Sequence, residues 1–370
     1  MNEDKATRYH RRGRLAGILS TLWTAVILVA LLLTGTSHVL RDWAGGLAGP
    51  APTLIVALYV FVLSLAFEAA TLPFTFYRGF LLERHYGLST ETMGHWLRDH
   101  AKAALIGVVF AELAAVFVYL ALRSRPGVWW AIAGAGYAAV TVVLVAVAPL
   151  VLLPLFFTFK PLDKETLRDR LTGLASKAGT RIMGVYEWTL SDRTKKANAA
   201  LTGMGRTRRI LLSDTLLAEY SDDEIEVILA HELAHHVHKD IWTSVLFDVV
   251  LAFAALLAAH LALLRGVAIF GLRDIADPAG LPVLLLAAGA IGVCVRPLLN
   301  ALSRAHERRA DSYALTITEN PSAFITAMKR LGQQNLAEES PSKLVQAFFY
   351  THPTIKERLR AAQGRAQPTQ

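Results

Sequence analysis

The stretch His231-Glu232-Leu233-Ala234-His235 decides how the rest of this chain is interpreted. It has the pattern H-E-x-x-H, and a capping box at residues 221–224 predicts that it lies on a helix. Side chains four residues apart share one helix face, so His231 and His235 can bind one metal ion together. Glu232 then lies where it can accept a proton from a water molecule at that ion. The stretch therefore predicts an incomplete zinc site, because a catalytic zinc usually has three protein ligands.

A second motif, Ser303–Asp311, offers the missing ligand. Glu307 and Asp311 are four residues apart and share one helix face. Glu307 can be the third ligand, while Asp311 can accept a hydrogen bond from a ligating imidazole and fix its orientation. His306 is an alternative third ligand, although it points roughly 100° away from Glu307 around the helix. An ordinary solvated, charged helix is the other interpretation of this segment.

Long apolar runs surround these two motifs. The chain has 370 residues, 54% of them hydrophobic and 18% charged, with a mean hydropathy of +0.39. The runs match the roughly 30 Å thickness of a bilayer core, so we expect an α-helical polytopic membrane protein with about six transmembrane helices. The fourth run is long enough to tilt, to break near Pro149 and Pro154, or to contain a seventh span. The runs are Leu15–Gly35, Thr53–Leu72, Ala103–Leu122, Val128–Phe157, Ile241–Leu264 and Leu281–Leu302.

Basic residues before the first run predict the orientation of the chain. By the positive-inside rule they place the N terminus in the cytoplasm. A signal peptide is the alternative, but the apolar region is long and more spans follow it. Six spans then place residues 73–102, 158–240 and 303–370, with the predicted site, on the cytoplasmic side. The net charge of +8 fits basic cytoplasmic faces, so no nucleic-acid partner is implied. The basic residues are Lys5, Arg8, Arg11, Arg12 and Arg14.

The spans and motifs divide the chain into five segments. Residues 1–157 form an N-terminal membrane region with four transmembrane helices, and 158–240 a cytoplasmic catalytic segment with the H-E-x-x-H helix. Residues 241–302 form transmembrane helices five and six. Residues 303–361 form a C-terminal catalytic segment, with a helix break at 338–342, and 362–370 a disordered tail.

Within the first catalytic segment, the pattern predicts a helix near Lys164–Gly179 and strands within Ile182–Leu190 and Arg209–Ser213. The H-E-x-x-H helix lies directly before the fifth span and can continue straight into it. The only cysteine, Cys294, lies in the sixth run. The chain can therefore form neither an internal disulfide nor a cysteine-based zinc site.

Taken together, the two motifs resemble those of the gluzincin metalloproteases. The whole chain resembles the type I CAAX prenyl endopeptidase family, which are integral-membrane zinc proteases, and its Ala-, Gly- and Arg-rich composition with short loops is typical of a prokaryotic homologue. The matching segments extend from about residue 60 to 360. They are Phe67–Phe74, Tyr86–Ser89, Asn198–Gly205, Arg209–Asp214, and His352-Pro353 with Arg358-Leu359.

The resemblance implies roles for the residues of the two motifs. His231, His235 and Glu307 would ligate one Zn²⁺ per chain. Glu232 would act as general base and then general acid. Asp311 would orient one of the ligands.

The resemblance also assigns residues outside the two motifs. Asn198 and Ala199 would lie on an edge strand that pairs with the extended substrate backbone. His352 would help to stabilise the tetrahedral intermediate, and Arg358 would brace the site. Without the resemblance, Asn198 and His352 would be ordinary turn residues. The implied fold is a helical barrel of spans around a water-filled chamber, with a small cytoplasmic α+β zinc metalloprotease domain.

The expected function is hydrolysis of peptide bonds by a zinc-activated water with Glu232 as base. The expected partners are the lipid bilayer and a peptide or protein substrate. That substrate can be membrane-associated or lipidated. A membrane quality-control zinc protease of the heat-shock type is one alternative, although such proteins usually have fewer spans. A polytopic scaffold or transporter with a vestigial zinc site is another, against which the intact Glu232 argues.

Overall fold

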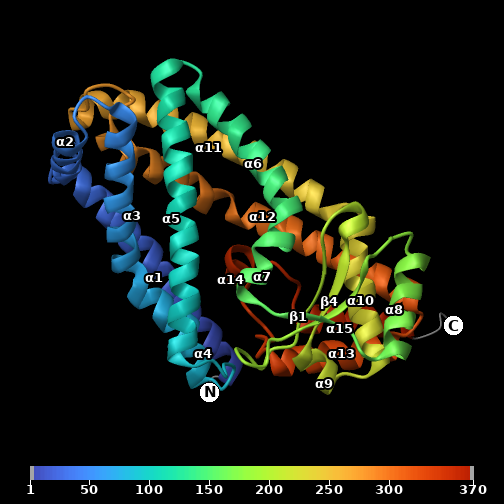
Figure 1. Ribbon diagram of the computed structural model, residues 1–370. Coiled ribbons are helices and arrows are strands. Elements are labelled where there is room, and N and C mark those ends of the chain that lie inside the picture. The colour runs from blue at the N-terminus through green and yellow to red at the C-terminus, as the bar shows by residue number, and fades with distance from the viewer. Residues whose placement is uncertain (1–3, 367–370) are drawn as a thin grey trace.

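The computed structural model describes residues 4–366, which form long helices and one small sheet (Figure 1). Six helical segments are long and apolar enough to cross a membrane, which confirms the predicted polytopic fold. In the described chain the fourth apolar run forms one span, α6 (Trp129–Val151), followed by the short helix α7 (Leu153–Phe156), and not two spans. The six segments are Lys5–Leu33, Pro52–His85, Met93–Ser124, Trp129–Val151, Asp240–Phe270 and Pro278–Thr318.

The six spans form a closed ring. Around it, α1 (Lys5–Leu33), α3 (Pro52–Phe76), α5 (Met93–Ser124), α6, α11 (Asp240–Phe270) and α12 (Leu281–Thr318) each contact the next, and α12 contacts α1. Only 6 to 33% of the apolar window of each span is buried. A packed bundle would bury one face of every helix. The low burial therefore indicates that the spans have an exposed inner surface as well as an outer one, as in the predicted barrel.

Shorter elements join the spans. A π-helical turn, η1 (Tyr77–Leu81), and α4 (Leu82–His85) extend α3 at the end of the ring near the sheet. At the opposite end lies α2 (Thr36–Ala48), a short helix that the sequence pattern did not predict. The 3₁₀ turn η3 (Pro278–Gly280) leads into α12 and packs against α2 and α3.

The sheet has four strands in the order β1-β2-β4-β3. Strand β2 (Gly184–Trp188) pairs antiparallel with β1 (Phe159–Pro161) and parallel with β4 (Arg209–Ser213), so both predicted strands form. Strand β3 (Ala199–Thr202) pairs antiparallel with β4 and, among the described residues, with no other strand. It is therefore an edge strand. The helix α8 (Glu165–Lys177) and the short α9 (Asp214–Glu219) and η2 (Gly205–Thr207) complete this region.

The helix α10 (Asp222–Val237) carries the H-E-x-x-H stretch and begins with the predicted capping box, in which Ser221 and Glu224 bond each other's backbone N–H groups. The prediction that it can continue into the fifth span is wrong. Lys239 adopts a left-handed conformation with φ 58° and ψ 35°, and α11 begins at Asp240. The break changes the chain direction and turns the Asp240 side chain back toward His235.

The C-terminal segment consists of α13 (Pro321–Gln334), α14 (Lys343–Phe349) and α15 (Ile355–Ala366). The predicted break at 338–342 lies between α13 and α14. The disordered tail predicted from residue 362 is wrong for 362–366, which belong to α15. Ala362 is buried in the core, and Arg365 donates to Ser312 of α12, so this last turn has contacts that composition alone does not reveal. Residues 367–370 lie outside the described range.

Candidate active site

The structure brings the three predicted metal ligands together between α10 and α12. His231, His235 and Glu307 each offer a ligand atom, and these atoms all lie within 4.8 Å of one another. Nε2 of His231 lies 3.2 Å from Oε2 of Glu307, and Nε2 of His235 lies 3.5 Å from Oε1. Oε2 of Glu307 is buried, and the ring nitrogen of His231, itself a predicted metal ligand, is the polar partner recorded beside it. Two imidazole nitrogens and a buried carboxylate oxygen fit a divalent metal such as zinc.

Asp311 and Arg358 support the first histidine. Nδ1 of His231 donates to Asp311 at 2.9 Å, which leaves Nε2 for the metal. Arg358 of α15 binds the same carboxylate through two nitrogens, with Nε 2.8 Å from Oδ2. Burial disfavours the cation of His231, but hydrogen bonds with Asp311 and Glu307 outweigh it and raise its pKa to about 9. The surroundings therefore attract positive charge, as a metal centre must.

Asp240 and Arg309 support the second histidine in the same way. Nδ1 of His235 donates to Oδ2 of Asp240 at 2.9 Å, and Arg309 of α12 pairs with the other carboxylate oxygen. Neither residue was predicted from the sequence. One sequence signal for Asp240 was present. The polar residues Lys239 and Asp240 come shortly after the motif, and an acidic residue is favoured in the first turn of a new helix. His306, the alternative third ligand, has its Nε2 4.0 Å from Asp240 and lies outside the ligand cluster.

Glu232 and His352 lie beside the ligands. Burial raises the pKa of the Glu232 carboxyl, while the neighbouring histidines oppose that shift. His352 comes from the segment between α14 and α15, and its Nε2 lies 3.3 Å from Oε1 of Glu307. Its side chain is 60% exposed, and Thr351 bonds its Nδ1 at 2.8 Å. The structure therefore places an imidazole at the open side of the cluster, where an approaching ligand would meet it.

Strand β3 lies next to the metal helix. Asn198 pairs with Ser213, whose backbone N–H donates to the Asn198 carbonyl at 3.0 Å. Because bonding directions alternate along a strand, the N–H and C=O groups of Ala199 and Leu201 point away from β4. Nε2 of His236, which the spacing places off the ligand face, donates to the Leu201 carbonyl at 3.0 Å. Among the described residues, the outward N–H and C=O groups of Ala199 have no hydrogen-bond partner, although the residue as a whole is only 8% exposed.

These features define a metalloprotease site at the end of a ring of membrane helices, and comparison with known proteins identifies its family. The family model described as peptidase family M48 matches residues 161–366. A model described as CAAX prenyl protease N-terminal, five membrane helices, matches residues 2–158, where the structure has four of the six candidate spans and the short α2. The chain belongs to peptidase family M48.

Individual relatives agree over most of the chain. The uncharacterized metalloprotease YhfN of Bacillus subtilis is 30% identical over 341 residues, covering 91% of this chain and 80% of the relative. A CAAX prenyl protease 1 homolog of Arabidopsis thaliana is 28% identical over 312 residues, covering 82% and 72%. The crystal structure of S. mikatae Ste24p shares the fold, with a TM-score of 0.87 at 22% identity over 97% of this chain and 88% of that one. The protein is therefore an integral-membrane metalloendopeptidase, and neither the heat-shock type nor the scaffold alternative is favoured.

Proposed function

We propose that this protein is a zinc endopeptidase in which His231, His235 and Glu307 bind one Zn²⁺ per chain and Glu232 is the general base and acid. The convergence of the three ligand atoms within 4.8 Å carries this proposal. Zinc bound there would lower the pKa of a water molecule and polarise the scissile carbonyl.

The chain's own residues perform the proton transfers. Glu232 accepts the proton of the attacking water and later donates it to the leaving nitrogen, and its partly buried carboxyl is suited to both steps. The His352 imidazole, exposed at the open side of the cluster, can donate a hydrogen bond to the oxyanion that forms. Asp311 and Arg358 keep the His231 ring in one orientation throughout.

Two variants test the assignment. Glu232→Gln is expected to keep one zinc per chain and to lose peptide hydrolysis, because the amide cannot accept the proton. Glu307→Ala is expected to lose bound zinc, measured by elemental analysis after dialysis. An active Glu232→Gln protein contradicts the assignment of the base, and unchanged zinc in Glu307→Ala contradicts the assignment of the ligand.

The extended substrate is proposed to pair with β3 through the outward N–H and C=O groups of Ala199, next to Asn198. The variant Ala199→Pro removes this donor but leaves the β3–β4 hydrogen bonds in place, because the lost N–H faces away from β4. One lost hydrogen bond of about 1 kcal/mol should raise KM roughly fivefold. Substitution of the neighbouring Ala200 by Pro should instead disrupt the sheet, since that N–H faces β4. A KM unchanged in Ala199→Pro would exclude pairing at this position.

The substrate is proposed to be a membrane-associated peptide or protein, with a lipidated chain as the most specific case. The support is the position of the ligand cluster, directly beside the first residue of the span α11 and on the helix of the span α12. Glu232→Gln protein expressed in the host membrane should retain bound peptides that mass spectrometry can identify. Recovery of only soluble, unmodified peptides would contradict the membrane-associated class.

The catalytic end is proposed to face the cytoplasm, with residues 1–157 and 241–302 as the membrane units and 158–240 and 303–366 as the catalytic units, the last extended to the end of α15. The support is the cluster of Lys and Arg before the first span and in the segments around the site. A green fluorescent protein fused after residue 370 should fluoresce, and an alkaline phosphatase fused there should be inactive. The opposite pattern would reverse the orientation.

A further inference from the structure

The segment between Leu190 and Ala197 leads directly into β3 and also touches the membrane helices. Its backbone pairs with the loop that precedes α5, where Thr90 N donates to the Arg193 carbonyl at 3.1 Å. The Lys195 N–H donates to the Leu88 carbonyl at 2.9 Å. The strand proposed to bind substrate is therefore connected to the membrane region immediately upstream of its first residue.

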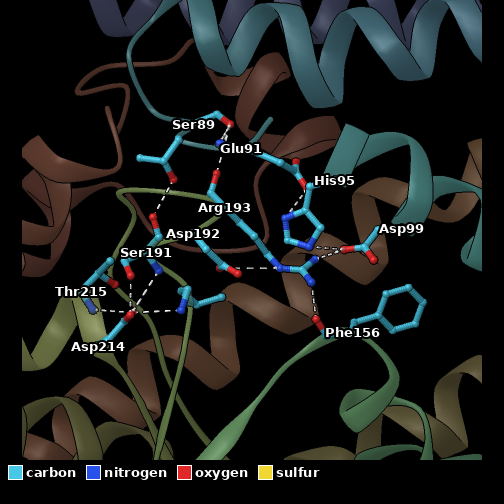
Figure 2. A network of polar contacts seen from close by, with 12 residues as sticks. Ser89, Glu91, His95, Asp99, Phe156, Ser191, Asp192, Arg193, Asp214 and Thr215 are labelled. Atoms are coloured by element: carbon cyan, nitrogen blue, oxygen red, sulfur yellow. Dashed lines mark hydrogen bonds and ion pairs between the residues drawn. The ribbon is translucent and has the colours of Figure 1, made fainter. Parts of the chain in front are cut away.

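The Arg193 side chain is the centre of this connection (Figure 2). Its guanidinium binds the Asp99 carboxylate of α5 and the Phe156 carbonyl of α7. It also lies 4.8 Å from the centre of the Phe157 ring. Arg193 and Asp99 side chains are only 17% and 12% exposed, so the pair is largely shielded from water. A planar guanidinium can make these three contacts at once, which a lysine cannot.

The other end of the segment is attached to the sheet. The Asp214 carboxylate, directly after β4, accepts from the backbone N–H groups of Leu190 and Ser191 at 2.9 and 3.1 Å, and from the Ser191 hydroxyl (Figure 2). It also accepts from the N–H of Thr215. The segment is thus held between the sheet through Asp214 and the membrane helices through Arg193.

We propose that Arg193 is a positioning residue that fixes the position of β3 relative to the membrane helix α5, so that a substrate strand meets the metal site in the correct alignment. The inference rests on the proposed role of β3 in substrate binding. Arg193 is five residues before Asn198, and it contacts neither the ligands nor Glu232. Its loss should therefore weaken substrate binding without changing the metal centre.

A metal ion is a poor alternative explanation of the polar groups around Arg193. Glu91, His95 and Asp99 do offer atoms within 4.8 Å of one another. However, Asp99 is already paired with the Arg193 guanidinium, and Nε2 of His95 lies 3.6 Å from the same carboxylate. A permanent cation thus occupies the place at Asp99 that a metal would take.

The test compares variants of the full-length protein in detergent, using an internally quenched peptide that the wild type cleaves. Arg193→Ala should raise KM about tenfold, keep kcat within about twofold, and keep one zinc per chain. Asp99→Asn should also raise KM, and the double variant should add little to Arg193→Ala, because Arg193→Ala has already lost the contact with Asp99. Arg193→Lys should have a KM between those of the wild type and Arg193→Ala. If Arg193→Ala fails to fold, Arg193→Lys and Asp99→Asn still test the proposal.

A matched control separates positioning from general stability. Arg170 of α8 also binds two carboxylates, Asp223 and Glu226, but both belong to α10 and neither to the segment that leads into β3, so Arg170→Ala should leave KM unchanged. A KM within twofold of wild type in both Arg193→Ala and Asp99→Asn, even with a lowered melting temperature, overturns the proposal. If Ala199→Pro raises KM and these two variants do not, only the role of Arg193 fails. If Ala199→Pro also has no effect, the edge-strand proposal itself fails.

Discussion

The two aspartates that hold the histidines should contribute unequally to zinc affinity. Asp240→Asn and Asp311→Asn each remove the negative charge that accepts a hydrogen bond from a histidine Nδ1 and keep the side-chain shape. Loss of such a partner typically weakens metal binding by about 10- to 100-fold. A charge-assisted hydrogen bond worth about 1.5–3 kcal/mol gives a similar range.

The surroundings place the two variants at opposite ends of this range. Arg358, which pairs with Asp311, is only 10% exposed, and its Nη2 lies 3.3 Å from Nδ1 of His231. In Asp311→Asn this cation would be left unpaired beside a metal ligand, so we expect a loss of about 100-fold. Arg309, which pairs with Asp240, is 44% exposed and can be solvated when its partner is neutral. We therefore expect about tenfold for Asp240→Asn.

Zinc affinity is measured by competition with a chromogenic chelator at neutral pH on detergent-purified protein. The control is Asp248→Asn, also on α11, because Asp248 accepts from the Tyr137 hydroxyl and not from a histidine. The control should keep the wild-type Kd. A wild-type Kd in both test variants, or a greater loss for Asp240→Asn than for Asp311→Asn, would refute the reasoning.

Three further predictions concern stability and are read from melting temperatures. Lys239→Gly should stabilise the protein by roughly 0.5–1 kcal/mol, because glycine adopts the left-handed conformation at φ 58° without steric cost; a lower melting temperature would contradict this. Gly203→Ala should destabilise by about 1–3 kcal/mol, since φ is +85° and a Cβ would lie 2.5 Å from the Thr207 carbonyl oxygen; Gly205→Ala, also at positive φ but with open space, should cost less. Burial opposes ionisation of Asp214, but hydrogen bonds from Ser191, Leu190 and Thr215 outweigh it and hold its pKa below the ordinary 3.8, so its contribution is present above that pH and is lost as pH falls through the folded-state pKa. The melting-temperature deficit of Asp214→Asn should therefore be largest near neutral pH and shrink below about pH 4, and a deficit independent of pH would contradict the assignment.

The spacing of residues in the sequence was sufficient to predict those parts of the site that lie on a single helix. The H-E-x-x-H spacing places His231 and His235 one turn apart, and the same rule brings Glu307 and Asp311 to one face of α12. The spans followed from the length of the apolar runs, because a bilayer sets a minimum helix length. Each of these features depends on residues that are neighbours in the sequence.

The features that the sequence did not reveal depend on turns without a glycine or proline signal and on contacts between distant segments. The break between α10 and α11 occurs at Lys239, a residue type that rarely adopts a left-handed conformation, so the support of His235 by Asp240 was missed. The bond from His236 to Leu201 and the contacts of Arg193 join segments that only the tertiary fold brings together. Periodicity within one segment holds no information about them.

Two arginine–aspartate pairs beside the ligands, Arg309–Asp240 and Arg358–Asp311, explain how a metal centre can be built across membrane spans. Glu307 reaches His231 only because α11 leaves the site at Asp240 and α12 returns to it, and a shift of one residue in α12 would rotate Glu307 by roughly 100°. Arg309 of α12 binds Asp240, the first residue of α11, and so fixes the register of the two spans at the level of the ligands. Arg358 fixes α15 to α12 through Asp311 in the same way. Each pair therefore supports an imidazole of α10 and also attaches α12, the helix that supplies Glu307, to a neighbouring helix, so the membrane spans are part of the support of the metal site.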